Sequence, residues 1–254
     1  MTVRLGEPLL RRQRVASTMD VVASLGRAGA PEGLVVVAEE QTSGRGRAGR
    51  AWVAPAGTGL LCSILLRPPV RPADLSALPL LIGVAVSRAI EAVAPVCPSV
   101  KWPNDVLIDG RKVAGILLNA RATAEHVDFV VAGIGVNVSA TTAGNDGAIT
   151  IEEASRSSID QRRLLDGLLE ELSSIYNGFL GAPATPDLEP WRARAHLRSE
   201  QVTIRDGNRE LVGRFHDVDS TGALLLEDPD GSLRRIISGD LIRGPRSVHS
   251  ARAT

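Results

Sequence analysis

The 254-residue sequence has few aromatic residues, few cysteines and no excess charge of either sign. Aromatic residues make up 3% of the chain, so valine, leucine, isoleucine and alanine must fill the core. Cys62 and Cys97 stand in apolar sequence contexts without a CxxC motif or metal-ligand spacing, and we expect free thiols in a reducing cytoplasm. The 29 basic and 29 acidic residues balance, which argues against a basic nucleic-acid-binding domain.

Segments that would direct the chain into a membrane are also missing. The N-terminal residues MTVRLGEPLLRRQRV contain no apolar core of a signal peptide. The longest apolar run, residues 78–86, is too short to span a bilayer and predicts the start of a core helix. We therefore expect a cytoplasmic protein without membrane association. The sequence contains no Gly-x-Ser-x-Gly motif and its four histidines form no metal-ligand cluster, so hydrolase and zinc-enzyme interpretations lack residues.

Lysine is almost absent, although arginine is plentiful. Two of the 29 basic residues are lysines, Lys101 and Lys112, and the other 27 are arginines. Both lysines fall within one stretch of twelve residues. Because a compact ammonium and a planar guanidinium are not interchangeable where geometry matters, we infer that these two positions require lysine itself. Two surface lysines left by chance are the alternative.

Apolar patterns predict a first part in which strands and helices are intermixed. Ser17 and Thr18 stand where an N-cap belongs, before a short amphipathic helix. Apolar runs at residues 34–38, 59–66 and 129–138 predict buried strands, and residues 106–118 predict two strands joined by the hairpin turn Asp109-Gly110. Helices are predicted over residues 78–93 and 159–180, and the proline-rich residues 181–190 indicate a boundary or linker.

The pattern changes after residue 200, where short β segments alternate with four turn signals that end in glycine. The turns fall at Asp206-Gly207, Thr221-Gly222, Asp230-Gly231 and Ser238-Gly239. This spacing is typical of a small antiparallel barrel. We therefore predict an α+β domain over residues 1–195, a small C-terminal β-barrel over residues 196–246 and a disordered tail over residues 247–254.

A loop rich in glycine and arginine, residues 42–50, follows the first buried strand. Gly44, Gly46 and Gly49 match the spacing of a dinucleotide fingerprint, but that motif should open a helix, and a strand is predicted here. A P-loop is excluded because Arg50-Ala51 stands where Lys-Ser/Thr is required. Three arginines on a glycine-rich loop favour close binding of carboxylate or phosphate oxygens. A solvated surface loop is the alternative.

Three further segments combine charged or small residues with stiff or apolar surroundings. Residues 101–105, KWPND, place Lys101 and Asp105 on either side of a Trp-Pro step that favours an extended backbone. Residues 111–117, RKVAGIL, place Lys112 at the start of an apolar strand, and residues 133–137, GIGVN, would let a ligand lie against the backbone. Taken singly, each segment is also compatible with core packing or a turn.

Four segments, AEEQTSGRGRAGRAW, VKWPNDVLI, RKVAGILL and AGIGVNV, closely resemble in order and spacing the signature segments of biotin protein ligases. The resemblance covers roughly residues 15–245, and its last part, GALLLEDPDG followed by SGDL, looks like the family's small Src-homology-3-like barrel. It implies a catalytic domain similar to those of class II aminoacyl-tRNA synthetases and lipoate ligases, with a mixed β-sheet flanked by helices. It also implies activation of biotin with ATP to biotinyl-5'-AMP, followed by transfer to a lysine of a biotin carboxyl carrier protein.

The resemblance implies roles for individual residues. The biotin-binding set comprises Ser17, Thr18, Gln41, Gly44, Arg45, Gly46, Arg47, Lys112 and Gly115. The ATP-binding set comprises Arg45, Arg47, Arg50, Trp52, Lys101, Asn104, Lys112 and Asn137. The catalytic set is Lys112, Arg47 and Asp105, with Mg²⁺ on the departing pyrophosphate and no metal ligand assigned in the chain. Fixed cations are needed because an anionic carboxylate must attack an anionic phosphate, and the polar segments 42–50 and 140–147 are expected to cover the reactive adenylate.

The sequence departs from the family pattern at two positions. Met19 follows Thr18 where the family usually has asparagine, and Ala148 stands where some relatives place a tryptophan under the adenine. Sixteen residues precede Ser17, from which we expect no N-terminal DNA-binding domain and no specific DNA binding. The expected acceptor is the biotin carboxyl carrier domain of a biotin-dependent carboxylase, and a weak homodimer is left open.

Two competing functions remain at this stage. The nearest is a lipoate or octanoate protein ligase of the same superfamily, against which Gln41 and the KWPND and KVAG segments favour biotin. The other is a non-catalytic module that binds an anion through the arginine loop. The two lysines argue against it, because arginine would serve simple anion binding equally well.

Overall fold

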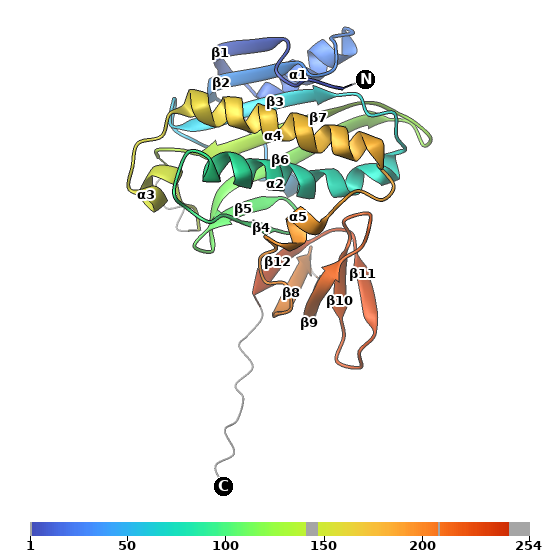
Figure 1. The fold of residues 1–254 in the computed structure, drawn as a ribbon. Coiled ribbons are helices and arrows are strands. Elements are labelled where there is room, and N and C mark those ends of the chain that lie inside the picture. The colour runs from blue at the N-terminus through green and yellow to red at the C-terminus, as the bar shows by residue number, and fades with distance from the viewer. Residues whose placement is uncertain (1, 141–146, 208, 244–254) are drawn as a thin grey trace.

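The computed structural model describes residues 2–140, 147–207 and 209–243, and Figure 1 shows two parts in this range. The larger part is a seven-stranded mixed sheet with the order β1-β2-β3-β7-β6-β5-β4. Its strands are β1 (Leu9–Val15), β2 (Val35–Gln41), β3 (Gly59–Leu66), β4 (Ser99–Lys101), β5 (Asp105–Ile108), β6 (Arg111–Ala122) and β7 (Val127–Asn137). Only β1 and β2 run parallel; the other neighbours are antiparallel. The α+β prediction is confirmed.

The helices divide between the two faces of this sheet (Figure 1). One face packs against α2 (Leu78–Glu91), which follows the 3-10 helix η2 (Pro72–Ala77), and against α4 (Gln161–Gly181). The other face carries α1 (Thr18–Arg27) and a smaller apolar cluster. Alternate residues of β7 serve the two faces: Val130 and Ala132 face α2 and α4, whereas Phe129 and Val131 face α1. Two short helices, α3 (Ile151–Ser155) and α5 (Glu189–Arg192), complete this part.

The most apolar helical segment, Pro72–Glu91, is long and apolar enough to cross a membrane by composition alone. Within its most apolar window, 72% of the residues are buried inside the fold. It packs on the sheet against β4, β5 and β6 and lies beside α4, so its apolar character is explained by core packing, as predicted for residues 78–93.

The smaller part is a five-stranded antiparallel sheet with the order β11-β10-β9-β8-β12. Its strands are β8 (Gln201–Asp206), β9 (Arg209–Val218), β10 (Leu224–Glu227), β11 (Leu233–Ile236) and β12 (Asp240–Arg243). All four predicted turn glycines have positive φ angles, between 58° and 130°, which glycine adopts without strain. The antiparallel architecture predicted after residue 200 is therefore confirmed, whereas the predicted boundaries at residues 195 and 246 stay predictions.

The proline-rich residues 181–190 are not a loose linker. Leu188 and Trp191, at and just beyond its end, are 2% and 0% exposed. The chain then pairs with β4, where the backbone N–H of Val100 donates to the carbonyl of Arg194 at 2.8 Å. A proline-rich composition marked the change in local structure, but two apolar side chains anchor this segment to the larger part.

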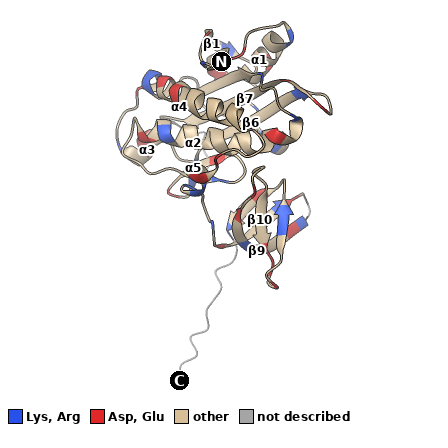
Figure 2. Ribbon diagram, turned by 45° about the vertical axis from the view of Figure 1, so that its right-hand side comes forward, with Lys and Arg blue, Asp and Glu red and all other residues tan. Residues whose placement is uncertain are grey.

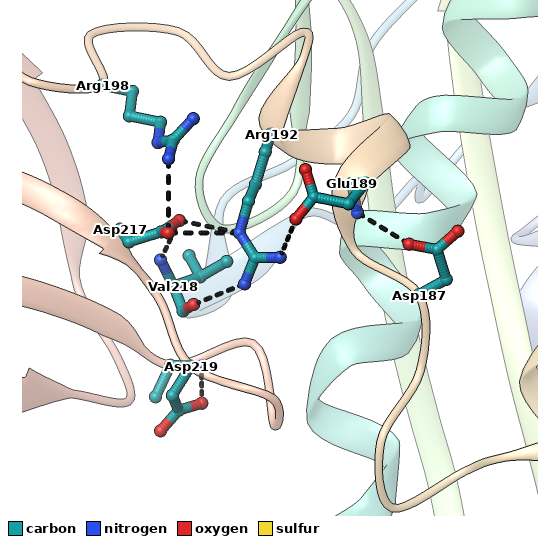
Figure 3. A network of polar contacts seen from close by, with 8 residues as sticks. Asp187, Glu189, Arg192, Arg198, Asp217, Val218 and Asp219 are labelled. Atoms are coloured by element: carbon teal, nitrogen blue, oxygen red, sulfur yellow. Dashed lines mark hydrogen bonds and ion pairs between the residues drawn. The ribbon is translucent and has the colours of Figure 1, made fainter.

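Polar contacts join the two parts close to this anchor (Figure 3). Arg192 Nε donates to both carboxylate oxygens of Asp217 at 3.0 and 3.2 Å, and its Nη2 donates to the carbonyl of Val218 at 3.1 Å. Trp102 Nε1 donates to the carbonyl of Gly222 at 3.0 Å. In the view of Figure 2, acidic and basic residues are interspersed over both parts, as the zero net charge suggests.

Candidate active site

A cavity of about 270 Å³ opens where the arginine loop and the N-terminus of α1 meet strands β5, β6 and β7. It collects residues that lie far apart in the sequence. Thirteen of the fifteen predicted site residues line it: Ser17, Thr18, Gln41, Arg45, Gly46, Arg47, Arg50, Trp52, Asn104, Asp105, Lys112, Gly115 and Asn137. Gly44 and Lys101 are the two predicted residues outside this lining.

Neutral polar groups from α1 and the end of β2 form one region of the cavity. Gln41 Oε1 accepts from the backbone N–H of Thr18 at 2.7 Å and from its hydroxyl at 3.0 Å, and that hydroxyl also contacts Ser63 Oγ at 2.7 Å. Ser17 takes the predicted N-cap position, but its hydroxyl does not cap the helix. It is buried without a hydrogen-bond partner. Because buried hydroxyls are almost always bonded, Ser17 is poised for a polar ligand atom.

Two glycines on neighbouring strands form the floor beneath Trp52. Gly115 of β6 pairs with Gly135 of β7. A Cβ at Gly135 would lie 2.4 Å from Trp52 Cε2, and one at Gly115 would lie 3.0 Å from Trp52 Cζ3. Only glycine lets the indole lie this close to the backbone. The indole Nε1 is buried without a partner, so it is free to donate to a ligand.

A β-bulge directs Lys112 into the cavity. Along β5 and β6, Val106 pairs with Ala114 but Leu107 pairs with Lys112, so one extra residue is inserted in β6. In a regular strand Lys112 and Gly115 would face opposite sides. Here a Cβ at Gly115 would lie 3.1 Å from Lys112 Nζ, so both positions serve the same cavity.

The Lys112 ammonium pairs with the acidic residue of the KWPND segment. Its Nζ lies 2.6 Å from Asp105 Oδ1 and 5.5 Å from the centre of the Trp52 ring. Both charged side chains are partly covered, with 35% of Lys112 and 23% of Asp105 exposed. The two lysine-containing motifs therefore meet at one ion pair, which joins Lys112 to Asp105 and does not involve Lys101.

The arginine loop, by contrast, is irregular and contains a single 3-10 turn, η1 (Arg47–Gly49). Arg47 Nη1 donates to Asn104 Oδ1 at 3.1 Å and its Nη2 donates to the carbonyl of Gly239 at 3.4 Å. Arg50 pairs with Asp240 at 3.0 Å, and Asp240 also lies 3.7 Å from Arg47. The smaller sheet thus supplies a carboxylate to two arginines of the cavity.

Two other predicted residues have structural contacts that the sequence did not suggest. Arg45 pairs with Asp20 of α1 at 2.8 Å. Asn137 Nδ2 donates to the carbonyls of Lys112 and Ile149 at 3.3 and 3.4 Å, so it fixes the backbone beside the lysine. Lys101 lies opposite Asp105 in the β4–β5 pair but is not among the lining residues. Burial lowers its pKa, against the opposing effect of Asp105 and Asp240.

Three positions noted in the sequence for other reasons also line the cavity. Met19 and Gly133 lie in its wall, and Ala148 is a wall residue that forms a bridge with Lys112. Asp240 lies in the SGDL segment, about 190 residues from its arginine partners, and no local signal connects them. Trp52 is the only aromatic side chain among the described lining residues. The prediction that Ala148 stands at the adenine position is not tested, and most of the polar segment 140–147 lies outside the described residues.

Comparisons with known proteins show the family of this chain. The sequence model of the biotin/lipoate A/B protein ligase family matches residues 11–137, and that of the biotin protein ligase C-terminal domain matches residues 200–244. The bifunctional ligase/repressor BirA of Bacillus spizizenii is 34% identical, over 94% of this chain and 75% of that protein. The biotin–[acetyl-CoA-carboxylase] ligase of Mycobacterium tuberculosis is 32% identical, over 94% of this chain and 95% of that protein.

Solved structures give the same result. The biotin protein ligase from Aquifex aeolicus in complex with biotin and ATP superposes with a TM-score of 0.78 at 28% identity, covering 92% of this chain and 97% of that chain. The larger part therefore places the chain in the class of the biotin and lipoate ligases. The chain belongs to this family and, since its relatives match over both parts, to the biotin protein ligases within it.

Proposed function

We propose that this ligase activates biotin with magnesium-bound ATP and transfers it to one lysine of a biotin carboxyl carrier domain. One observation carries the proposal: the cavity offers neutral polar groups on the α1 side and fixed cations on the β5–β6 side. Gln41 ends β2 and Lys112 begins β6, three strand spacings apart in the sheet order. Three spacings amount to roughly 14 Å. The cavity therefore suits a small molecule with a polar neutral head and an acidic tail, as biotin has.

The ureido head of biotin would bind among Ser17, Thr18 and Gln41. Gln41 Oε1 is already engaged by Thr18, so its amide nitrogen is left to donate to the ureido carbonyl. The unpartnered Ser17 hydroxyl can donate or accept. The dithiolane ring of lipoate has no group that would use these donors and acceptors, which is why we favour biotin over lipoate or octanoate.

In the first step, a carboxylate oxygen of biotin attacks the α-phosphorus of ATP and pyrophosphate leaves. Two anions must approach, so the site has to present positive charge before the substrates meet. Lys112, Arg45 and Arg47 would hold the carboxylate and α-phosphate oxygens, and Arg50 would hold the outer phosphates. Cations fixed in a partly covered cavity stabilise the developing charge far more than mobile ions in water do.

Magnesium enters this scheme as part of the nucleotide substrate. The described residues include no group of three or more histidine, cysteine, aspartate or glutamate side chains that could hold a metal ion. Mg²⁺ in such sites is usually held by substrate phosphates, water and one or two carboxylates. The carboxylates that could approach the phosphates are Asp105 and Asp240, each paired with a cation here.

In the second step, the neutral amine of the acceptor lysine attacks the acyl carbon of biotinyl-5'-AMP, and AMP leaves with the phosphate oxygen. Asp105 would orient the amine and take its proton, since it lies at the same cavity wall as Lys112. The acceptor domain, a cytoplasmic location and the absence of specific DNA binding remain predictions.

The test is to incubate the protein with biotin, ATP and Mg²⁺ and to measure pyrophosphate together with the adenylate by mass spectrometry. We expect biotinyl-adenylate, and biotin on a single lysine once a carrier domain is added. A parallel reaction contains lipoate or octanoate in place of biotin. Formation of a lipoyl- or octanoyl-adenylate, with none from biotin, would overturn the proposal.

A further inference from the structure

Met19 brings an apolar side chain to the part of the cavity nearest the polar head site. It follows Thr18 in the first turn of α1, lines the cavity and is 7% exposed. A Cβ built at Gly133 would lie 2.7 Å from Met19 Sδ and 2.9 Å from its Cγ, so the thioether lies directly on the β7 backbone. Gly133 pairs with Leu117 of β6, which also lines the cavity. Met19, Leu117 and Gly133 therefore form one apolar wall.

The three side-chain positions of this wall carry no hydrogen-bond donor. Thr18, the residue before Met19, has both its backbone N–H and its hydroxyl bound to Gln41 Oε1. The Ser63 hydroxyl is occupied by Thr18 as well. The resemblance to biotin ligases leads one to expect asparagine at position 19, whose amide would provide a donor here. In this chain a soft, polarisable thioether replaces it.

The position of the wall relative to the head site determines which part of the ligand it meets. The sulfur-containing ring of biotin is fused to the ureido ring, so the sulfur must lie within one ring width of the groups that bind the ureido. Met19 is the residue adjacent to Thr18 and covers the glycine of β7 next to them. With the ureido ring bound by Thr18 and Gln41, the ring sulfur would lie against Met19, Leu117 and Gly133.

We propose that Met19 is a specificity-determining residue that makes this ligase select biotin over forms of biotin oxidised at the ring sulfur. The inference rests on the proposed function. A sulfoxide adds one strongly polar oxygen to the sulfur, and an oxygen turned towards this wall loses its water without gaining a donor from Met19, Leu117 or Gly133. Apolar pockets discriminate against a substrate with one added oxygen by about 10- to 100-fold. An amide at position 19 removes most of that difference by donating to the oxygen.

The experiment compares kcat/KM for adenylate formation from biotin with that from each epimer of biotin sulfoxide. Met19→Gln keeps nearly the length and volume of methionine and adds a donor, whereas Met19→Leu is the matched apolar control. We expect the wild type and Met19→Leu to prefer biotin over at least one epimer by about 10-fold or more. Met19→Gln should lower that preference at least fivefold while biotin itself is still used. Met19→Asn, the residue of the family pattern, serves as the second variant should the glutamine variant not fold.

The outcomes distinguish a failure of the role proposed for Met19 from a failure of the proposed biotin activation. If biotin is adenylated but the wild type accepts both epimers as well as biotin, Met19 has no selective role. The same holds if the glutamine, asparagine and leucine variants all keep the wild-type preference. If the wild type forms no adenylate from biotin under any condition, the proposed function itself fails.

Discussion

The β5–β6 hairpin and the arginine loop both bring cations to the cavity, but they hold them in different ways. Lys112 belongs to a strand whose backbone is paired on both sides, and a bulge aims it at the cavity. The loop at residues 42–50 has one 3-10 turn, and its Ala48 adopts a φ of 52°. Arg45, Arg47 and Arg50 are held by side-chain contacts from α1, from the segment after β4 and from the smaller sheet.

This difference indicates that the hairpin and the loop have different roles in catalysis. A cation fixed by the backbone of a sheet costs no reorganisation when charge develops, which suits the atom nearest the reaction. Arginines held by exposed side-chain pairs can exchange those partners for phosphates at a small free-energy cost, because each exposed pair contributes about 1 kcal/mol or less. The hairpin should therefore determine the rate of the chemical step, and the loop should determine how tightly ligands are held.

The largest effect is expected at the hairpin. Lys112→Arg keeps the charge, but the longer, planar guanidinium cannot take the place of an ammonium that packs 2.6 Å from Asp105 and against the glycine floor. We expect adenylate formation to fall by about 100-fold or more, the usual result of losing one preorganised donor. Single-turnover pyrophosphate release measures this directly.

The matched control is Arg111→Lys, the reverse exchange one residue away. Arg111 pairs with Glu153 on the exposed surface and does not line the cavity. Its substitution should leave the rate of adenylation unchanged. Equal rates for Lys112→Arg and the wild type would show that the position needs only a positive charge, and the interpretation of the two lysines would be wrong.

A smaller effect is expected at the glycine floor that both regions share. In Gly135→Ala the new methyl would overlap Trp52, so the indole must move away from β7. Overpacking of this kind typically costs 1–3 kcal/mol, so we expect biotin to bind about 10-fold more weakly. Titration of tryptophan fluorescence with biotin provides the measurement. Gly178→Ala, in α4 with no neighbouring atom within 4 Å of the new methyl, should bind biotin normally.

The two regions also differ in how well the sequence predicted them. The hairpin turn, the strands around it and the place of Lys112 in the cavity follow from local signals: apolar runs, Asp109-Gly110 and the scarcity of lysine. Asp109 and Gly110 adopt φ angles of 51° and 74°, as a two-residue hairpin turn requires. The bulge that aims Lys112 was not predictable, because it depends on the register between β5 and β6 rather than on residue type.

The contacts of the arginine loop could not be predicted from sequence. The loop itself was recognised as an anion-binding candidate, but its partner Asp240 lies about 190 residues away and in the other part of the molecule. Nothing in the SGDL segment distinguishes this aspartate from a turn residue. Tertiary packing alone brings it to the cavity, and the same holds for Met19 against Gly133.

Asp240 therefore offers a test of the loop with a modest expected effect. Its carboxylate competes with nucleotide phosphates for Arg47 and Arg50, and it is 45% exposed. Asp240→Asn removes the competing charge, so we expect KM for ATP to fall by about twofold to fivefold, as for an exposed ion pair. The effect should shrink at high salt. A rise in KM for ATP would instead show that Asp240 positions the arginines for the nucleotide.

The smallest effect is expected for self-biotinylation, the labelling of this protein by the biotinyl-adenylate that it forms. The test is a variant at Arg47, where the loop meets the segment before the hairpin. Arg47 joins the loop to Asn104 and Gly239, so Arg47→Gly should loosen the cover of the cavity and let biotinyl-adenylate escape to amines of an added bystander protein.

Apart from its terminal amine, this chain offers two amines of its own. Lys112 is held by Asp105, and Lys101 is partly buried and outside the cavity lining. Burial lowers the pKa of Lys101, so a larger fraction of it is the neutral nucleophile, and any trace of self-labelling should appear there. Intact-mass and peptide mass spectrometry of both proteins after one incubation should find the bystander heavily biotinylated and the variant nearly unmodified. Heavy labelling of Lys101 or Lys112 would mean that these lysines are freely accessible, and the contrast between a fixed hairpin and an exchangeable loop would not hold.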